Sequence, residues 1–167
     1  AVYDGEAADG CRGGTPHLHT ASSEGYVVIG GEGAVQTISA DGFAEHPLAA
    51  GDVVWFSPGT VHRLVNHGDL RLFVVMSNAG LPEAGDAVMT FTPDMLADAA
   101  TYEAAAALPD GDGRAQAVSA RRDLAVQGFL ALREAGAEGL AELHRAAAAL
   151  VRDRVPGWAE TWERTVA

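Results

Sequence analysis

The chain has 167 residues, a formal net charge of −12, 48% hydrophobic residues and one cysteine, Cys11. This length suits one domain with a sizeable core, and the strong negative charge argues against nucleic acid or an anionic membrane as a partner. One cysteine excludes an internal disulfide, no apolar run approaches the roughly 18 residues of a membrane span, and the first ten residues lack the basic and apolar regions of a signal peptide, so we expect a soluble cytoplasmic protein.

The first predicted element carries two histidines, His17 and His19, which share one face of a strand because side chains alternate along it. Glu24 follows after a short turn, and His62 comes later, beyond a second turn. Three imidazoles and one carboxylate form a mixed nitrogen and oxygen ligand set. The sequence therefore predicts a site for a divalent transition metal: iron, manganese, nickel, copper or zinc.

The first half of the chain reads as short β-branched segments separated by glycine-containing turns. Short strands at this spacing are typical of a sandwich or a barrel. One of the predicted turns is Gly30-Gly31. The strands are expected at residues 26–29, 34–39, 53–56, 62–65 and 71–76.

The chain divides near Asn78, and after Leu81-Pro82 the composition becomes rich in alanine and leucine, which predicts helices. A helix is expected to start at Thr92-Pro93-Asp94, because proline suits a first turn, and to run to about Leu108. A linker at 110–113 then leads to the tail. The tail is expected to form helices at 121–135 and 138–154, separated by Gly136, and a short last helix from Pro156.

The tail helices need a partner surface, because apolar residues recur on them at steps of three and four. We expect Leu143, Leu150, Trp158 and Trp162 to be buried. The tail can serve as a cap on the rest of the chain, as a contact with a second subunit, or as a lid.

The residues around the four predicted ligands resemble the two motifs of the cupin superfamily, which are small β-barrels that hold a metal inside. The first motif, G-x5-H-x-H-x3,4-E-x6-G, is matched by His17, His19, Glu24 and Gly31, without its leading glycine. The second, G-x5-P-x-G-x2-H-x3-N, is matched by Gly51, Gly59, His62 and Asn66, with Ser57 in place of the proline. The resemblance covers roughly residues 13–78.

The resemblance implies a mainly β fold with α, a double-stranded β-helix barrel followed by a C-terminal helical extension. We accordingly expect a barrel at residues 1–80, a helix and linker at 81–113, and the helical extension at 114–167. It also implies a homodimer in which the tail can take part.

The resemblance further implies a metal-dependent enzyme acting on a small-molecule substrate, and we favour an oxidoreductase of the dioxygenase type. A non-redox isomerase or lyase and a non-catalytic small-molecule-binding protein stay open, because one fold hosts many functions. The metal surroundings read as apolar, which suits a partly apolar substrate. These surroundings are expected to include Val28, Val54, Trp55, Phe56, Leu64 and Phe73.

Two residues are candidates for catalysis, Glu24 and Tyr26, which share one strand face. Glu24 can bind the metal, orient a histidine ligand, or act as a base. Tyr26 can donate a proton or hydrogen bond to the substrate, or it can simply pack in the core. Arg63 has the opposite parity to His62 and is expected to point away from the metal.

Overall fold

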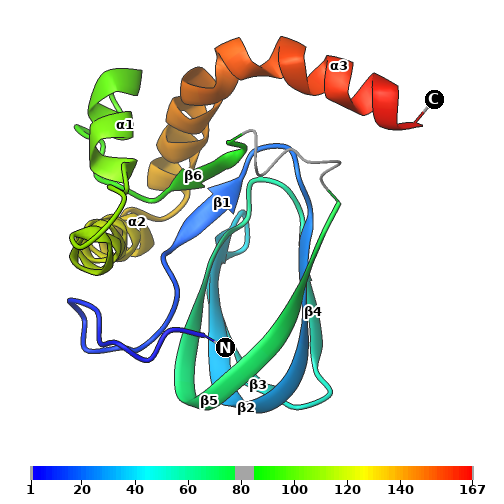
Figure 1. Ribbon diagram of the computed structural model, residues 1–167, viewed down its shortest axis with the longest axis vertical. Coiled ribbons are helices and arrows are strands. Elements are labelled where there is room, and N and C mark those ends of the chain that lie inside the picture. The colour runs from blue at the N-terminus through cyan, green and yellow to red at the C-terminus, as the bar shows by residue number, and fades with distance from the viewer. Residues whose placement is uncertain (1, 78–84, 167) are drawn as a thin grey trace.

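The computed structural model describes residues 2–77 and 85–166 and consists of a β-sheet part followed by a helical C-terminal part (Figure 1). One antiparallel sheet curves into an open barrel with the strand order β3-β2-β5-β1-β6, and β4 pairs with β2. The expected β architecture with a C-terminal helical extension is confirmed. The strands are β1 (His17–His19), β2 (Glu24–Ser39), β3 (Gly42–Ala49), β4 (Val53–Phe56), β5 (Val61–Met76) and β6 (Ala87–Met89).

The two long strands β2 and β5 replace pairs of short strands that the sequence predicts. Gly30-Gly31 does not end a strand, because β2 continues through it with register shifts against β5. Gly31 has φ 72°, and a Cβ there would lie 2.1 Å from the carbonyl oxygen of Asp69. Glycine permits this conformation and this close approach, so a β-bulge forms where the sequence suggests a turn.

The bulge divides β2 into two parts that pair with different strands. Before it, residues 24–27 of β2 lie between β4 and β5; after it, residues 33–39 lie between β3 and β5. β1 pairs with β5 through His17 and His62, and β6 pairs with the other edge of β1. The pairing therefore brings distant parts of the chain together around β1.

The helices are α1 (Ala99–Ala106), α2 (Arg114–Val151), the 3-10 turn η1 (Arg152–Arg154) and α3 (Val155–Val166). The start predicted for the first helix is wrong, because Asp98 caps it by accepting a hydrogen bond from the Thr101 amide at 2.9 Å. α2 begins at Arg114, earlier than predicted, and the predicted break at Gly136 is confirmed by its φ of 63° and ψ of −140°. Within the described residues, none of the helices combines the length and apolarity that crossing a membrane would require.

The helices pack on the sheet through a shared apolar core. Leu18 and Val61 of the sheet belong to the same buried cluster as Phe129 and Leu143 of α2. The tail thus covers the barrel surface that carries β1 and β6, as Figure 1 shows.

The predicted burial of the tail holds only in part. Leu143 and Trp158 are buried and Leu150 is partly buried, but Trp162 is 51% exposed. Figure 1 shows the C-terminal end of α3 reaching past the barrel. The division into segments 1–80, 81–113 and 114–167 stays a prediction, and its first boundary, with Asn78, lies outside the described residues.

Candidate metal centre

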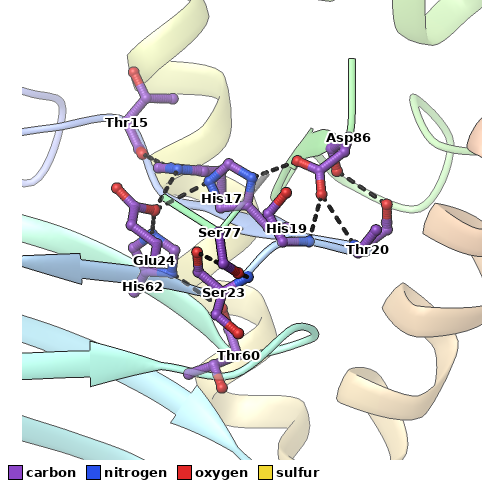
Figure 2. Close-up of polar contacts among 12 residues, drawn as sticks. Thr15, His17, His19, Thr20, Ser23, Glu24, Thr60, His62, Ser77 and Asp86 are labelled. Atoms are coloured by element: carbon purple, nitrogen blue, oxygen red, sulfur yellow. Dashed lines mark hydrogen bonds and ion pairs between the residues drawn. The ribbon is translucent and has the colours of Figure 1, made fainter. Parts of the chain in front are cut away.

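The four predicted ligand residues converge at one place inside the barrel (Figure 2). His17 and His19 project from β1, Glu24 opens β2, and His62 lies beside His17 on β5. One ligand atom from each residue lies within 4.8 Å of the others. The Glu24 Oε2 atom lies 3.8, 3.0 and 2.8 Å from the Nε2 atoms of His17, His19 and His62, respectively.

Each of the three rings is oriented by an acceptor on its other nitrogen. The Nδ1 atoms of His17 and His62 lie 2.8 and 3.0 Å from the carbonyl oxygens of Thr15 and Thr60. The Nδ1 atom of His19 lies 2.6 Å from Asp86 Oδ1. We therefore assign a proton to each Nδ1, which leaves the three Nε2 atoms as the metal-binding atoms.

This arrangement has a clear chemical consequence. In the neutral tautomers, three nitrogen lone pairs and a carboxylate oxygen point at one small region, so that region requires positive charge. A divalent cation supplies it, and imidazole with carboxylate suits iron, manganese, nickel, copper and zinc. The four residues are thus able to bind a divalent transition metal, as the sequence predicts.

The electrostatics of the cluster differ from residue to residue. Burial, reinforced by the neighbouring His62, lowers the pKa of His17 to about 3. Burial acts in the same direction on His19, but hydrogen bonds with Asp86 and Glu24 outweigh it and raise the pKa of His19 to about 9. Burial opposes ionisation of Glu24, yet the close contacts of its carboxylate with the His19 and His62 rings hold its pKa well below the usual range. The centre thus contains a permanent carboxylate and a strongly basic imidazole.

Asp86 is the functional residue that the sequence reasoning missed. Its side chain is fully buried, and its Oδ2 atom accepts hydrogen bonds from the amides of Ala21 and Ser22 at 3.0 and 2.8 Å. Figure 2 shows it contacting His19 while Glu24 contacts the same ring at its other nitrogen. A carboxylate in this position fixes the tautomer of a metal-binding histidine and increases its basicity. The motif carries no sign of Asp86, because the residue reaches the site only through the pairing of β6 with β1.

An aromatic wall lies on one side of the cluster. The Phe56 ring stacks on His62, with centroids 4.6 Å apart and an interplanar angle of 5°. Tyr26 packs at 5.2 Å against Phe56 and at 6.1 Å from His62. Burial raises the pKa of Tyr26 and the Glu24 carboxylate raises it further, so the phenol stays protonated. The His17 side chain is 22% exposed against 1% for His62, so the centre is most accessible from the His17 side.

The predicted apolar surroundings are correct for one face of the strands only. Val28 and Phe56 are buried in the barrel core, and Val54 and Leu64 pack against it. Trp55 and Phe73 are 56% and 64% exposed, so their predicted place near the metal is wrong. They pair with Gly25 and Val27, which alternate with the inward-facing Glu24 and Tyr26.

Arg63 also alternates with an inward residue and binds elsewhere, as predicted. Its guanidinium donates to Asp9 and to Gln36, each at 2.6 Å, and lies over the Phe129 ring. Arg63 therefore ties the N-terminal segment and α2 to the barrel and takes no direct part in the centre.

Part of the chain matches a known protein family. Residues 6–76 match the family model described as "Cupin domain". No curated protein matches the chain. Among solved structures, a predicted oxalate decarboxylase from Thermotoga maritima is 28% identical over 36% of this chain and 51% of that chain, with a TM-score of 0.33.

Two further solved structures have similar extents. An oxalate oxidase in complex with glycolate is 26% identical over 37% of this chain and 33% of that chain, with a TM-score of 0.33. A Streptomyces nucleoside dehydratase is 22% identical over 37% of this chain and 46% of that chain, with a TM-score of 0.31. The matched part thus spans about half the length of these chains or less. Residues 6–76, which contain His17, His19, Glu24 and His62, thus match a cupin domain.

Proposed function

We propose that the chain is a metal-dependent cupin enzyme that binds a divalent transition metal through His17, His19, Glu24 and His62. The observation that carries the proposal is the convergence of three Nε2 atoms on the Glu24 carboxylate, with every Nδ1 held by an acceptor. Four protein ligands leave room for further ligands on a six-coordinate metal such as iron or manganese. When bound, the metal would act as a Lewis acid or would activate oxygen.

We further propose that the substrate is a small, partly apolar molecule and that the reaction is an oxidation of the dioxygenase type. Tyr26 and Phe56 provide an apolar wall beside the ligands, and the partly exposed His17 marks the side of entry. An apolar wall with a few polar groups is typical of small-molecule sites. In this scheme the wall excludes water, and Glu24 binds the metal.

A second candidate is a non-redox isomerase or lyase, and the protonated phenol of Tyr26 beside the Glu24 carboxylate favours it. Here Tyr26 would donate a proton to the substrate and Glu24 would leave the metal to accept one. A proton transfer by a positioned side chain contributes about 10²–10⁴-fold to a rate. Tyr26→Phe should therefore lower such an activity by a factor in this range while metal binding persists.

The experiment is an oxygen-uptake and product screen of the iron-, manganese- and zinc-loaded chain against pools of small molecules. Substrate-dependent oxygen uptake with iron or manganese, lost in His62→Ala, supports the oxidation. Turnover without oxygen uptake, retained with zinc and lost in Tyr26→Phe, supports the second candidate. Tight binding of a pool component without any turnover contradicts both and points to a binding protein.

We propose that two copies of the chain pair through the outer face of the sheet. Val53 and Trp55 of β4 and Phe73 and Val75 of β5 are 47–67% exposed and face the same side. Trp55 and Phe73 together leave roughly 200–300 Å² uncovered. That is a large share of an interface of about 800 Å² per partner.

Light scattering tests the homodimer directly. Phe73→Ser should shift the mass from two chains to one, and Trp162→Ser, which changes a similarly exposed aromatic on α3, tests whether the tail takes part. A wild-type chain that stays monomeric at micromolar concentration contradicts the proposal. A cytoplasmic location also stays a prediction, supported by the single cysteine.

A further inference from the structure

The turn between β4 and β5, residues 57–60, contacts two of the four proposed metal ligands, His19 and His62, and lies outside the cluster itself. The amide of Gly59 donates to the carbonyl oxygen of His19 at 2.8 Å. The carbonyl oxygen of Thr60 accepts from His62 Nδ1 at 3.0 Å. The turn therefore fixes the backbone of one histidine and the ring of another, so a shift of the turn moves both.

The outer side of this turn is held by the helical extension. His144 of α2 lies with its Nε2 atom 2.8 Å from the Gly59 carbonyl oxygen, to which it donates. The amide at the other end of the same peptide group, that of Thr60, donates to the carbonyl oxygen of Ser57 at 3.1 Å. The Gly59–Thr60 peptide is thus held at both its oxygen and its nitrogen.

His144 is well placed to hold the turn, although its own side chain is exposed. Its helical neighbours Leu143 and Ala147 are 5% and 1% exposed and belong to the core that joins α2 to the sheet. Gly59 has φ +83°, and a Cβ built on it would lie 3.4 Å from His144 Nε2. The packing of α2 therefore fixes the position of the His144 imidazole. Gly59, which has no side chain, allows the imidazole to approach the turn.

We propose that His144 is a positioning residue for the metal centre, through which the helical extension fixes the turn that orients His19 and His62. This inference rests on the proposed metal site. His144 contacts Gly59, and the turn that contains Gly59 contacts the carbonyl oxygen of His19 and the ring of His62. The tail is then part of the site as well as a cap on the barrel.

The expected loss of metal affinity follows from the removal of one hydrogen bond, between His144 and the Gly59 carbonyl oxygen. A neutral hydrogen bond in a protein has a net effect that corresponds to about a two- to tenfold change in an equilibrium constant. Removing the donor at position 144 should therefore weaken metal binding by about that factor. It should also change the geometry of the ligands, because the turn that carries the Thr60 acceptor of the His62 ring is less firmly held.

The test uses the full chain loaded with cobalt(II), whose visible spectrum reports ligand geometry. His144→Leu removes the donor, His144→Asn shortens it, and His144→Gln offers an amide donor at similar reach. His46→Leu and His67→Leu, at exposed positions on β3 and β5, are matched controls. The measurements are the cobalt dissociation constant, the visible spectrum, and the thermal midpoint without metal.

We expect His144→Leu and His144→Asn to raise the cobalt dissociation constant two- to tenfold and to alter the spectrum. His144→Gln should restore both, and the two controls should match the wild type. Unchanged cobalt affinity and spectrum in His144→Leu overturn this inference but leave the proposed metal site intact. A change confined to the thermal midpoint overturns it in the same way, since the contact then only stabilises the fold. A wild-type chain that binds no cobalt overturns the metal site and this inference with it.

Discussion

Replacing Asp86 with asparagine is the most informative single change, because it keeps the shape of the side chain and removes its charge. The carboxylate accepts three hydrogen bonds, from His19 Nδ1 and from the amides of Ala21 and Ser22. An amide has one oxygen and one NH₂ group. Asp86→Asn therefore leaves a donor facing either the imidazole N–H or the two backbone amides.

Two effects of the change can be given magnitudes. A buried donor without an acceptor costs about 1–3 kcal/mol, so the free energy of unfolding should fall by that amount. Loss of a carboxylate that orients a metal-binding histidine typically weakens metal affinity about 10–100-fold. The pKa of His19 should also fall from about 9, because the hydrogen bond from Asp86 is a main cause of its increase.

The assay is a competition titration of zinc against a chromophoric chelator at pH 7.5, together with urea unfolding. Asp110→Asn is the matched control, because its side chain is fully exposed in the turn before α2. Zinc affinity of Asp86→Asn within twofold of wild type, in a chain that is folded, would refute the role of Asp86.

Four further predictions concern the pH dependence of metal binding and of folding, and the packing of the tail. Because the pKa of His19 is raised from 6.5 to about 9, the imidazole is protonated at neutral pH and a metal must displace that proton. Metal affinity should therefore rise about tenfold per pH unit from 6.5 to 9 and then level off. Calorimetry in buffers of different ionisation enthalpy should show one proton released on metal binding near pH 8. The sign for folding without metal is opposite, since the stabilisation from a raised pKa is complete below pH 6.5 and is lost as the pH rises through 9, which urea unfolding across this range measures. Phe129→Ala should lower the free energy of unfolding by about 3–5 kcal/mol, because the ring is fully buried between α2 and the sheet, and a loss under 1 kcal/mol would contradict this packing. Deleting residues 114–167 should cause aggregation or loss of the dimer, because it uncovers Leu18 and Val61; light scattering that shows a soluble truncated chain of unchanged assembly would contradict this.

The sequence was sufficient to predict which four residues cluster, because their spacing is a local property. His17 and His19 lie on one face of any strand, and the turn pattern places His62 at the start of another. Parity also gave the inward direction of Tyr26 and the outward direction of Arg63. Where the outcome depended on alternation along one strand, sequence reasoning succeeded.

It failed where the outcome depended on other strands or on neighbouring helices. Asp86 reaches His19 only because β6 pairs with β1, a contact without a local signal. Phe73 was expected at the metal from its apolar character, but register with Val27 turns it outward. Trp162 lies on the helical face expected to be buried, yet α3 extends beyond the surface that it would cover.

The measurement that tests the central claim most directly is the metal content of the wild-type chain and of His62→Ala after metal loading and gel filtration. We predict one divalent ion per wild-type chain, and little or none in His62→Ala at unchanged secondary structure, because His62 supplies a buried ligand atom at the centre of the cluster. Full metal occupancy in a folded His62→Ala, or a wild-type chain that retains no metal, would contradict the account.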